Sequence, residues 1–277
     1  MPEARGPEPS RLDVALVARG LARSRAHAAA LVRDGRVRVD GTPVVKPSAP
    51  VAGTQAIGVE AGDRYVSRAA GKLAGALDAF GIDAAGMTAL DAGASTGGFS
   101  QVLLDRGAAF VLAVDVGHGQ LSPELEPEIR AGRLVSLEGV NVRDLDAERV
   151  APHLGGRRVD LVVADLSFIP LRLVLPALVG AAPGAELVVL VKPQFEVGRE
   201  GVREGIVRDP ARRADAVAGV LWAAHDLGLR TAGIVSSTVV GTHGNSEYLA
   251  WLSPSVGGDP SEWSERITGI TRDSAGA

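Results

Sequence analysis

The sequence predicts an α/β fold, with a seven-stranded doubly wound sheet preceded by a small α+β unit. From residue 67 onward, short β-branched runs alternate with helical segments, which is typical of a mostly parallel sheet. Residues 11–46 instead show two short helical patterns and then a Val-x-Val run before Asp40-Gly41, a β-hairpin signal. We therefore predict a small domain over 1–58, a linker over 59–64, the α/β domain over 65–254 and a loosely ordered tail over 255–277.

The composition excludes several classes of site. The 277 residues include no cysteine, which rules out disulfides, thiolate catalysis and zinc–sulfur centres and agrees with a reducing cytoplasm. The first residues lack the apolar core of a signal peptide, and the apolar region 159–182 is too interrupted by charges and proline to span a bilayer. The histidines show no metal-ligand spacing. We expect a cytoplasmic, monomeric protein without a metal or a membrane-spanning segment.

The basic residues are unevenly placed along the chain. Residues 11–46 carry eight basic and three acidic side chains, a net charge of +5, whereas the whole chain is at −4 and the remainder therefore at about −9. Only three of the 29 basic residues are lysines, namely Lys46, Lys72 and Lys192. A lysine that persists against such a bias can do what arginine cannot, which is to lose a proton near neutral pH.

The basic segment resembles a known RNA-binding fold. The stretch RLDVALVARGLARSRAHAAALVRDGRVRVDG, from Arg11 to Gly41, is similar to the S4 domain, named after ribosomal protein S4. The resemblance implies that Arg11, Ser24, Arg25 and Arg36 face RNA phosphates and 2'-hydroxyl groups, which arginine binds well. The alternative is a solvated arginine-rich surface on a helical cap.

The larger domain is predicted to begin with a helix over 67–80 that carries Lys72. Further helices are expected from the glycine loop to about residue 106, over 169–182, and from Asp209-Pro210 to about 227. Seven strands are expected, over 88–91, 110–116, 134–139, 159–167, 186–193, 229–237 and 247–253.

The loop after the first strand of this domain has three interpretations. LDAGASTGGFS, residues 90–100, contains G-x-S-x-G, the serine-hydrolase elbow, for which His243 is a distal triad candidate. It also half-matches a dinucleotide fingerprint, but Ser95 occupies the second glycine position. The third interpretation is a site for S-adenosylmethionine, whose carboxylate suits the amides near the helix start.

The third interpretation gains weight from flanking acidic residues. Asp91 is suited to bind the methionine amine of S-adenosylmethionine directly or through water. Asp115, which ends the second strand, is placed to accept hydrogen bonds from both ribose hydroxyls. The predicted cofactor site comprises Asp91, Gly93, Ala94, Ser95, Thr96, Gly97, Gly98, Asp115, Val116 and Asn141.

Four charged side chains are expected at one edge of the sheet. Asp165 ends the fourth strand and Lys192 the fifth, and reactive groups collect beyond the carboxyl ends of parallel strands. If the seventh strand is antiparallel and lies beside the fifth, Glu247 begins at that edge too. Lys72, on the preceding helix, completes a Lys-Asp-Lys-Glu tetrad.

The tetrad and its motifs resemble those of the FtsJ-type ribose 2'-O-methyltransferases, within the TlyA family. The motifs are SRAAGKL, DAGASTGGF, VDLVVADLSF, LVKPQFEVG and GNSEYLAWL, and the likeness spans Arg11 to Leu252. It implies a Rossmann-like class I methyltransferase fold, S-adenosylmethionine as cofactor and cytidine 2'-hydroxyls of ribosomal RNA, on ribosomal subunits, as substrate. TlyA members also carry the name haemolysin, so a pore-associated protein is one alternative. A second alternative is a catalytically inactive RNA-binding protein with the same fold.

A mechanism follows from these residues. A ribose 2'-hydroxyl must lose its proton to attack a methyl group, and we predict Lys192 as the base. The neighbouring ammonium of Lys72 and partial burial would favour its neutral amine, while Asp165 and Glu247 orient the groups. The alternative is a salt-bridge cluster that only stabilises the sheet edge. Phe168 and Phe195 are candidates for stacking on a flipped base, or for core aromatics.

Overall fold

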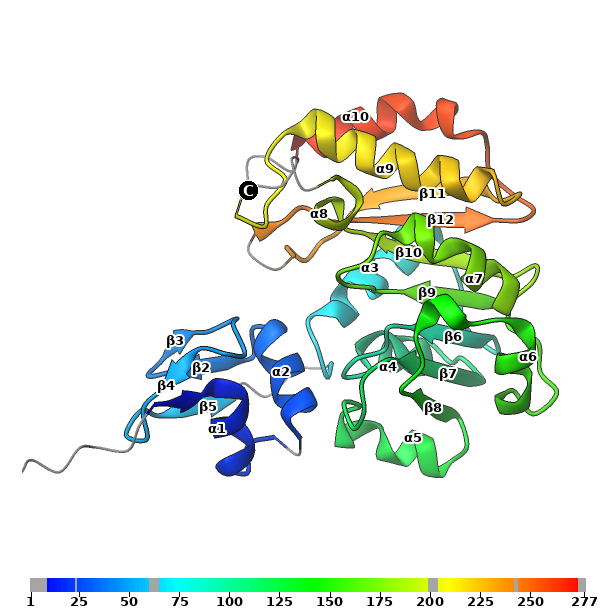
Figure 1. Cartoon of the computed structure of the whole chain (residues 1–277). Coiled ribbons are helices and arrows are strands. Elements are labelled where there is room, and N and C mark those ends of the chain that lie inside the picture. The colour runs from blue at the N-terminus through cyan, green and yellow to red at the C-terminus, as the bar shows by residue number, and fades with distance from the viewer. Residues whose placement is uncertain (1–8, 23, 60–64, 199–203, 242–243, 274–277) are drawn as a thin grey trace, which may run out of the picture.

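The N-terminal unit packs two helices against two small antiparallel sheets (Figure 1). The computed structural model describes residues 9–22, 24–59, 65–198, 204–241 and 244–273. The elements are β1 (Ser10–Arg11), α1 (Leu12–Ala18), α2 (Arg25–Arg33), β2 (Val37–Val39), β3 (Thr42–Pro43), β4 (Pro50–Val51) and β5 (Ile57–Val59). Leu12, Leu16 and Leu31 lie in its buried core. Asp40 and Gly41 both have positive φ, which confirms the predicted hairpin turn between β2 and β3.

Seven strands form the central sheet of the larger unit, in the order β11-β12-β10-β9-β6-β7-β8. Their bounds are β6 (Thr88–Ala92), β7 (Phe110–Asp115), β8 (Leu134–Glu138), β9 (Leu161–Ala164), β10 (Glu186–Val191), β11 (Arg230–Ser236) and β12 (Tyr248–Ser253). The five strands β6 to β10 pair in parallel, whereas β12 is antiparallel to both β10 and β11. The predicted antiparallel seventh strand beside the fifth is therefore confirmed.

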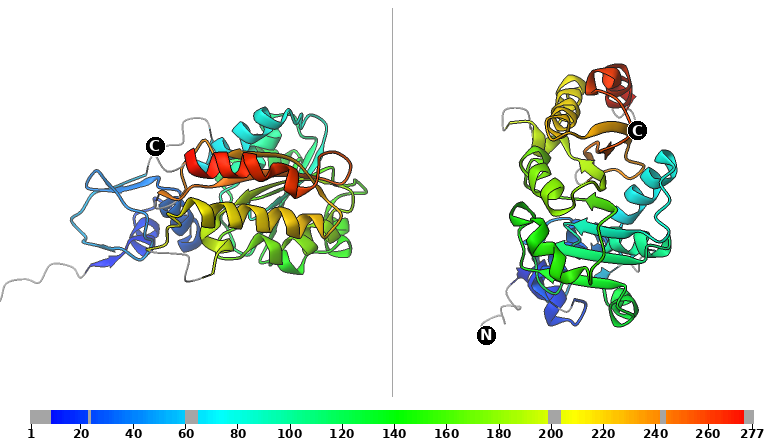
Figure 2. Two further views of the ribbon diagram at one scale, coloured as in Figure 1. Left: turned by 90° about the horizontal axis from the view of Figure 1, so that it is seen from above. Right: turned by 90° about the vertical axis from the view of Figure 1, so that its right-hand side faces the viewer.

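Helices cover both faces of this sheet (Figure 2). They are α3 (Ala69–Phe80), α4 (Gly98–Asp105), α5 (Glu126–Arg130), α6 (Ala147–Val150), α7 (Leu175–Ala181), α8 (Pro193–Glu196), α9 (Pro210–His225) and α10 (Ser264–Asp273). Leu73 of α3 and Leu103 of α4 belong to one apolar core, and Leu178 of α7 and Leu221 of α9 belong to the other. Strands buried on both faces explain the nearly continuous apolar runs of the sequence.

Two expectations about helices were wrong. The tail over 255–277 was expected to be loosely ordered, but it contains α10, which lies against α9 and β11. A capping box between Asp259 and Glu262 starts the preceding turn, and Ile267 is buried. The helix expected over 169–182 begins only at Leu175, because a 3₁₀ turn follows Pro170. The predicted linker residues 60–64 and His243 lie outside the described residues.

Candidate functional site

The four charged side chains of the predicted tetrad meet at the carboxyl edge of the parallel strands. Asp165 follows β9 and Lys192 follows β10 directly. Because Val191 at the end of β10 pairs with Tyr248 at the start of β12, Glu247 begins at this edge as well. Lys72 reaches the same place from the first turn of α3. All four line one cavity of about 970 Å³.

The tetrad is organised as two buried ion pairs. Nζ of Lys72 lies 2.6 Å from Oε2 of Glu247, and Nζ of Lys192 lies 2.5 Å from Oδ1 of Asp165. Burial alone would lower the pKa of Lys72, but the carboxylates of Asp165 and Glu247 outweigh it and raise that pKa. Burial would raise the pKa of Asp165, yet Lys192 and Lys72 hold it below its ordinary value. Charges of opposite sign therefore stabilise one another across the cluster.

The predicted mechanism assigns the two lysines different tasks, with Lys192 as the base and Lys72 as a neighbouring ammonium. In the structure each lysine has a carboxylate partner of its own within 2.6 Å. The role of Lys192 as the base stays a prediction.

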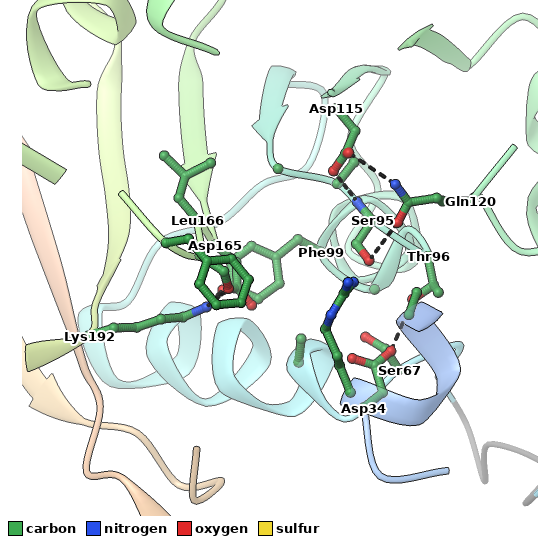
Figure 3. Close-up of a pocket in the computed structure, with 18 of the residues that line it drawn as sticks. Asp34, Ser67, Ser95, Thr96, Phe99, Asp115, Gln120, Asp165, Leu166 and Lys192 are labelled. Atoms are coloured by element: carbon green, nitrogen blue, oxygen red, sulfur yellow. Dashed lines mark hydrogen bonds and ion pairs between the residues drawn. The ribbon is translucent and has the colours of Figure 1, made fainter. Parts of the chain in front are cut away.

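Sequence reasoning missed Ser167 as a member of the site. Nζ of Lys192 donates to Oγ of Ser167 at 3.0 Å. Figure 3 shows the ion pair that Lys192 also forms with Asp165. A weak signal was available, since Ser167 is two residues after Asp165 at the same strand end. The segment that follows β9 thus contacts Lys192 through two side chains.

The glycine loop adopts a shape that only glycine allows at two positions. Gly93 and Gly97 have φ of 85° and 91°, and α4 begins directly after them. A Cβ at Gly93 would lie 2.7 Å from the carbonyl oxygen of Asp165. The backbone of the loop therefore runs close to the tetrad segment and leaves the helix start open to the cavity, where amides bind carboxylates well.

The two predicted acidic residues differ in their surroundings. Oδ2 of Asp115 accepts a hydrogen bond from the Ser95 amide at 2.9 Å, and Oδ1 accepts from Gly117 at 2.7 Å and from Nε2 of Gln120 at 3.2 Å (Figure 3). Asp115 thereby joins the glycine loop to the next strand end. Gln120, which lines the cavity, was not predicted.

Asp91 is fully buried, and only one of its oxygens has a partner. Oδ2 accepts from Oγ of Ser100 at 2.7 Å, whereas Oδ1 has no hydrogen-bond partner among the described residues. Burial raises the pKa of Asp91 to about 7. The unpaired oxygen of this buried carboxyl, next to the glycine loop, suits a ligand that carries an amine, but Asp91 itself is not among the described residues that line the cavity. Contact between Asp91 and such an amine stays a prediction. S-adenosylmethionine has that amine and a carboxylate for the loop.

The remaining predicted cofactor residues lie in the glycine loop or line the cavity beside it. Ala94, Ser95, Thr96, Gly98, Val116 and Asn141 all line the cavity. Val116 is 66% exposed, and the side chain of Asn141 caps the 3₁₀ turn Val142–Asp144. Oγ of Ser95 donates to Oε1 of Gln120 at 3.4 Å. His243, the predicted triad partner of Ser95, lies outside the described residues.

The N-terminal unit contacts the loops of the predicted cofactor site. Oγ1 of Thr96 donates to Oδ2 of Asp34 at 3.4 Å, and Oγ of Ser24 donates to the carbonyl of Gly119 at the same distance. Burial and the nearby carboxylate of Asp165 raise the pKa of Asp34 to about 6. The two ends of α2 thus contact the two cofactor loops, and Asp34 lines the cavity.

The predicted RNA-binding residues of this unit fall into two groups. Arg11 and Arg25 both pair with Asp13, at 2.9 and 3.3 Å, and keep more than half of their side chains exposed. Ser24 caps α2, and the guanidinium of Arg36 donates to the carbonyl of Val66, so these two face the larger unit. Contact with RNA stays a prediction for all four.

Phe168 and Phe195 form an aromatic pair at the cavity. Their ring centroids lie 5.3 Å apart with planes tilted by 51°. Phe168 is 79% exposed, so it is no core aromatic, whereas Phe195 is half-buried. Phe168 also has a φ of 68°, a left-handed conformation that is rare for aromatic residues.

Comparisons with known proteins agree with this geometry. A model of the FtsJ-like methyltransferase family matches residues 65–253, and a model of the S4 domain matches residues 10–57. The 16S/23S rRNA (cytidine-2'-O)-methyltransferase TlyA of Mycobacterium tuberculosis is 53% identical over 247 residues, which cover 88% of this chain and 89% of that protein.

Two further relatives carry another name. Hemolysin A of Brachyspira hyodysenteriae is 36% identical and covers 87% of this chain and 98% of its own length. A solved structure from Streptococcus thermophilus, named as a hemolysin, superimposes with a TM-score of 0.72 at 33% identity, over 96% of each chain. Among the described residues, no helix is both long enough and apolar enough to cross a membrane.

Proposed function

The chain belongs to the FtsJ-like methyltransferase family, within its TlyA group, and on that premise we propose that it methylates ribose 2'-hydroxyl groups of ribosomal RNA. The observation that carries the proposal is the pair of buried ion pairs, Lys72–Glu247 and Lys192–Asp165, in one cavity with a glycine loop. The family supplies the reaction type, and the cavity supplies room for both a cofactor and a nucleotide.

When bound, S-adenosylmethionine would supply a methyl group on a sulfonium centre. The glycine loop would hold its carboxylate at the start of α4, and Asp91 its amine. Asp115 would accept from the ribose hydroxyls while it stays tied to Ser95. Val116 and Asn141 complete this part of the cavity.

Lys192 then accepts the proton of the RNA 2'-hydroxyl. Asp165 and Ser167 fix the position of its Nζ, and Lys72 with Glu247 balances the charge around it. General bases of this kind contribute about 10²- to 10⁴-fold to a rate. The alternative is an ion cluster that only stabilises the sheet edge. It predicts that substitution of Lys192 by arginine leaves the methyl-transfer rate nearly unchanged.

The S4 domain would bind structured RNA next to the active site. The exposed guanidinium groups of Arg11 and Arg25 suit phosphate contacts, and Phe168 with Phe195 suits a base turned out of its stack. The names of the relatives point to cytidine, in the small subunit, the large subunit or both. A ribosomal substrate supports the proposal that the enzyme acts in the cytoplasm.

A methyl-transfer assay tests the proposal. Purified enzyme, tritiated S-adenosylmethionine and 30S or 50S subunits from a strain that lacks the enzyme are incubated, and the RNA is analysed by mass spectrometry of nuclease fragments. We expect a 2'-O-methylcytidine in at least one subunit with wild-type enzyme and none with Lys192→Ala. Methylation of a base, or no transfer to either subunit, would overturn the proposal.

A further inference from the structure

A buried carboxyl outside the tetrad joins the two segments that carry the site. Glu196, at the end of α8, is only 6% exposed. Its Oε1 accepts a hydrogen bond from the backbone amide of Leu171 at 2.7 Å. Neither Glu196 nor Leu171 belongs to the described residues that line the cavity. Glu196 is therefore placed to act on the site through the backbone, without contact with a ligand.

The contact is reinforced in the opposite direction. Nη1 of Arg172, the neighbour of Leu171, donates to the backbone carbonyl of Glu196 at 3.2 Å. The segment after β9 and the segment after β10 are thus tied by one bond each way. Because a buried amide that loses its acceptor destabilises the protein, the Leu171 amide favours the folded arrangement in which Glu196 accepts from it.

The tied segments hold the groups that the proposed reaction needs. One runs from Asp165 past Ser167 and Phe168 to Leu171, and the other from Lys192 past Phe195 to Glu196. Phe168 is held in a left-handed conformation, which persists only when surrounding contacts determine it. The 2.5 Å ion pair and the aromatic pair both depend on the spacing of these two segments.

We propose that Glu196 is a positioning residue for methyl transfer, which fixes the spacing of the Asp165 and Lys192 segments through the Leu171 amide. The inference rests on the proposed function for its readout. What Glu196 must provide is an acceptor oxygen at the right reach, and a negative charge is not required for that role.

The protonation behaviour of Glu196 agrees with an acceptor role. Burial raises its pKa to about 7, against the opposing effects of the Leu171 amide and of Arg172. A carboxyl that is partly neutral near pH 7 still accepts through Oε1 if its proton resides on Oε2. Glutamine reproduces this neutral form, with an acceptor oxygen at the same reach.

The test compares Glu196→Ala and Glu196→Gln with a matched control. Asp259→Ala removes the cap of the 3₁₀ turn Pro260–Trp263, where the Asp259 side chain accepts from the Ser261 amide at 2.8 Å. Asp259 lies at the end of the sheet opposite the tetrad, because its neighbour Gly258 pairs with Thr231 near the start of β11. For each variant, kcat and the KM for RNA are measured per folded molecule, and cofactor affinity is measured by calorimetry.

We expect Glu196→Ala to lower kcat about 10- to 100-fold, because small misplacements of reacting groups are that costly, and to leave cofactor affinity within about twofold. Glu196→Gln should restore kcat to within about threefold of wild type. The inference is overturned if Glu196→Ala keeps the kcat of Asp259→Ala, or if Glu196→Gln is as inactive as Glu196→Ala.

If Glu196→Ala does not fold, the comparison of Glu196→Asp with Glu196→Gln tests the inference instead. Glu196→Asp keeps the charge but is one methylene shorter, so it should lose more kcat than Glu196→Gln. The reverse order would show that charge matters and reach does not, and would overturn the inference. A wild-type enzyme without 2'-O-methyl transfer overturns the proposed function as well, whereas an active wild type with an unaffected Glu196→Ala overturns this inference alone.

Discussion

Lys72 and Glu247 are 175 positions apart in the chain, yet Nζ of Lys72 lies 2.6 Å from Oε2 of Glu247, and neither side chain is more than 10% exposed. The pair joins the helix that precedes the sheet to the last strand of the sheet. It forms because β12 inserts antiparallel between β10 and β11, which brings the start of β12 to the edge that carries Asp165 and Lys192.

Removal of one partner from this pair should be costly. In Glu247→Gln, Lys72 stays buried with Asp165 as its remaining counter-charge, and we expect a loss of about 3 kcal/mol in the free energy of unfolding. Replacement of both residues, in Lys72→Met with Glu247→Leu, should recover part of that loss because no unpaired charge is left. Urea denaturation of the three proteins measures both effects.

An exposed ion pair serves as the control for this prediction. Arg106 and Asp78 also lie 2.6 Å apart, but their side chains are 36% and 64% exposed. Asp78→Asn should cost clearly less stability than Glu247→Gln, since water screens such pairs. Equal losses for Glu247→Gln and Asp78→Asn would contradict the assignment of a buried, tightly coupled cluster.

Lys192→Arg separates the charge of Lys192 from its proton chemistry. Arginine can still pair with Asp165, but it does not release a proton in proteins. We expect methyl transfer to fall by at least about 100-fold while cofactor affinity and stability change little. The measurement is single-turnover methyl transfer with the cofactor saturating. Near-normal transfer with the cofactor bound would leave the Lys192–Asp165 pair with a structural role only.

Asp91 should make both stability and cofactor binding depend on pH. Its pKa is raised to about 7 in the folded protein, from an unfolded value near 4. Between these values the folded state binds the extra proton, so the stability of the cofactor-free protein falls as pH rises from about 4 to about 7. Asp91→Asn should therefore be the more stable protein at pH 8, by up to about 4 kcal/mol, and similar to wild type near pH 4.

Cofactor binding should show the opposite trend. If ionised Asp91 holds the methionine amine, the affinity of the wild-type protein for S-adenosylmethionine rises as pH increases through about 7. Asp91→Asn keeps an acceptor for Ser100 but should bind about 10-fold more weakly at pH 8 and lose this pH dependence. Calorimetry from pH 6 to pH 8 measures both. The same slope in wild type and variant would assign the titration to another group.

The sequence predicted the layout of the larger domain because strand ends in a parallel sheet share one edge. Asp165, Lys192 and Glu247 could be brought together from strand positions and one assumption about β12. What it could not show is how charges pair, since that depends on side-chain reach across the cavity. It also could not show the burial of Glu196, because a glutamate in a four-residue helix is normally exposed.

The C-terminal error has a physical reason of its own. The Gly- and Ser-rich composition after residue 253 suggested disorder, although Asp259 and Glu262 already formed a capping-box pattern and Ile267 and Ile270 lay on one helical side. The helix is stabilised by α9, and in particular by the buried Arg213, whose Nη2 donates to the carbonyl of Thr271 at 2.6 Å. Tertiary contacts of this kind outweigh local composition.

Variants of Phe168 distinguish a role of its ring in RNA binding from a role in folding. Because Phe168 is 79% exposed, loss of its ring should cost little stability, whereas loss of stacking should raise the KM for RNA by about 10-fold in both Phe168→Ala and Phe168→Gly.

The two variants should differ in stability. At a φ of 68°, alanine keeps the strain and glycine removes it, so Phe168→Gly should be about 1 kcal/mol more stable than Phe168→Ala. Trp222→Ala, which removes a 44% exposed aromatic side chain from α9, should leave the KM for RNA unchanged. Steady-state kinetics and thermal denaturation of all three decide the matter, and a Phe168→Ala protein with normal KM but low stability would assign the ring to folding.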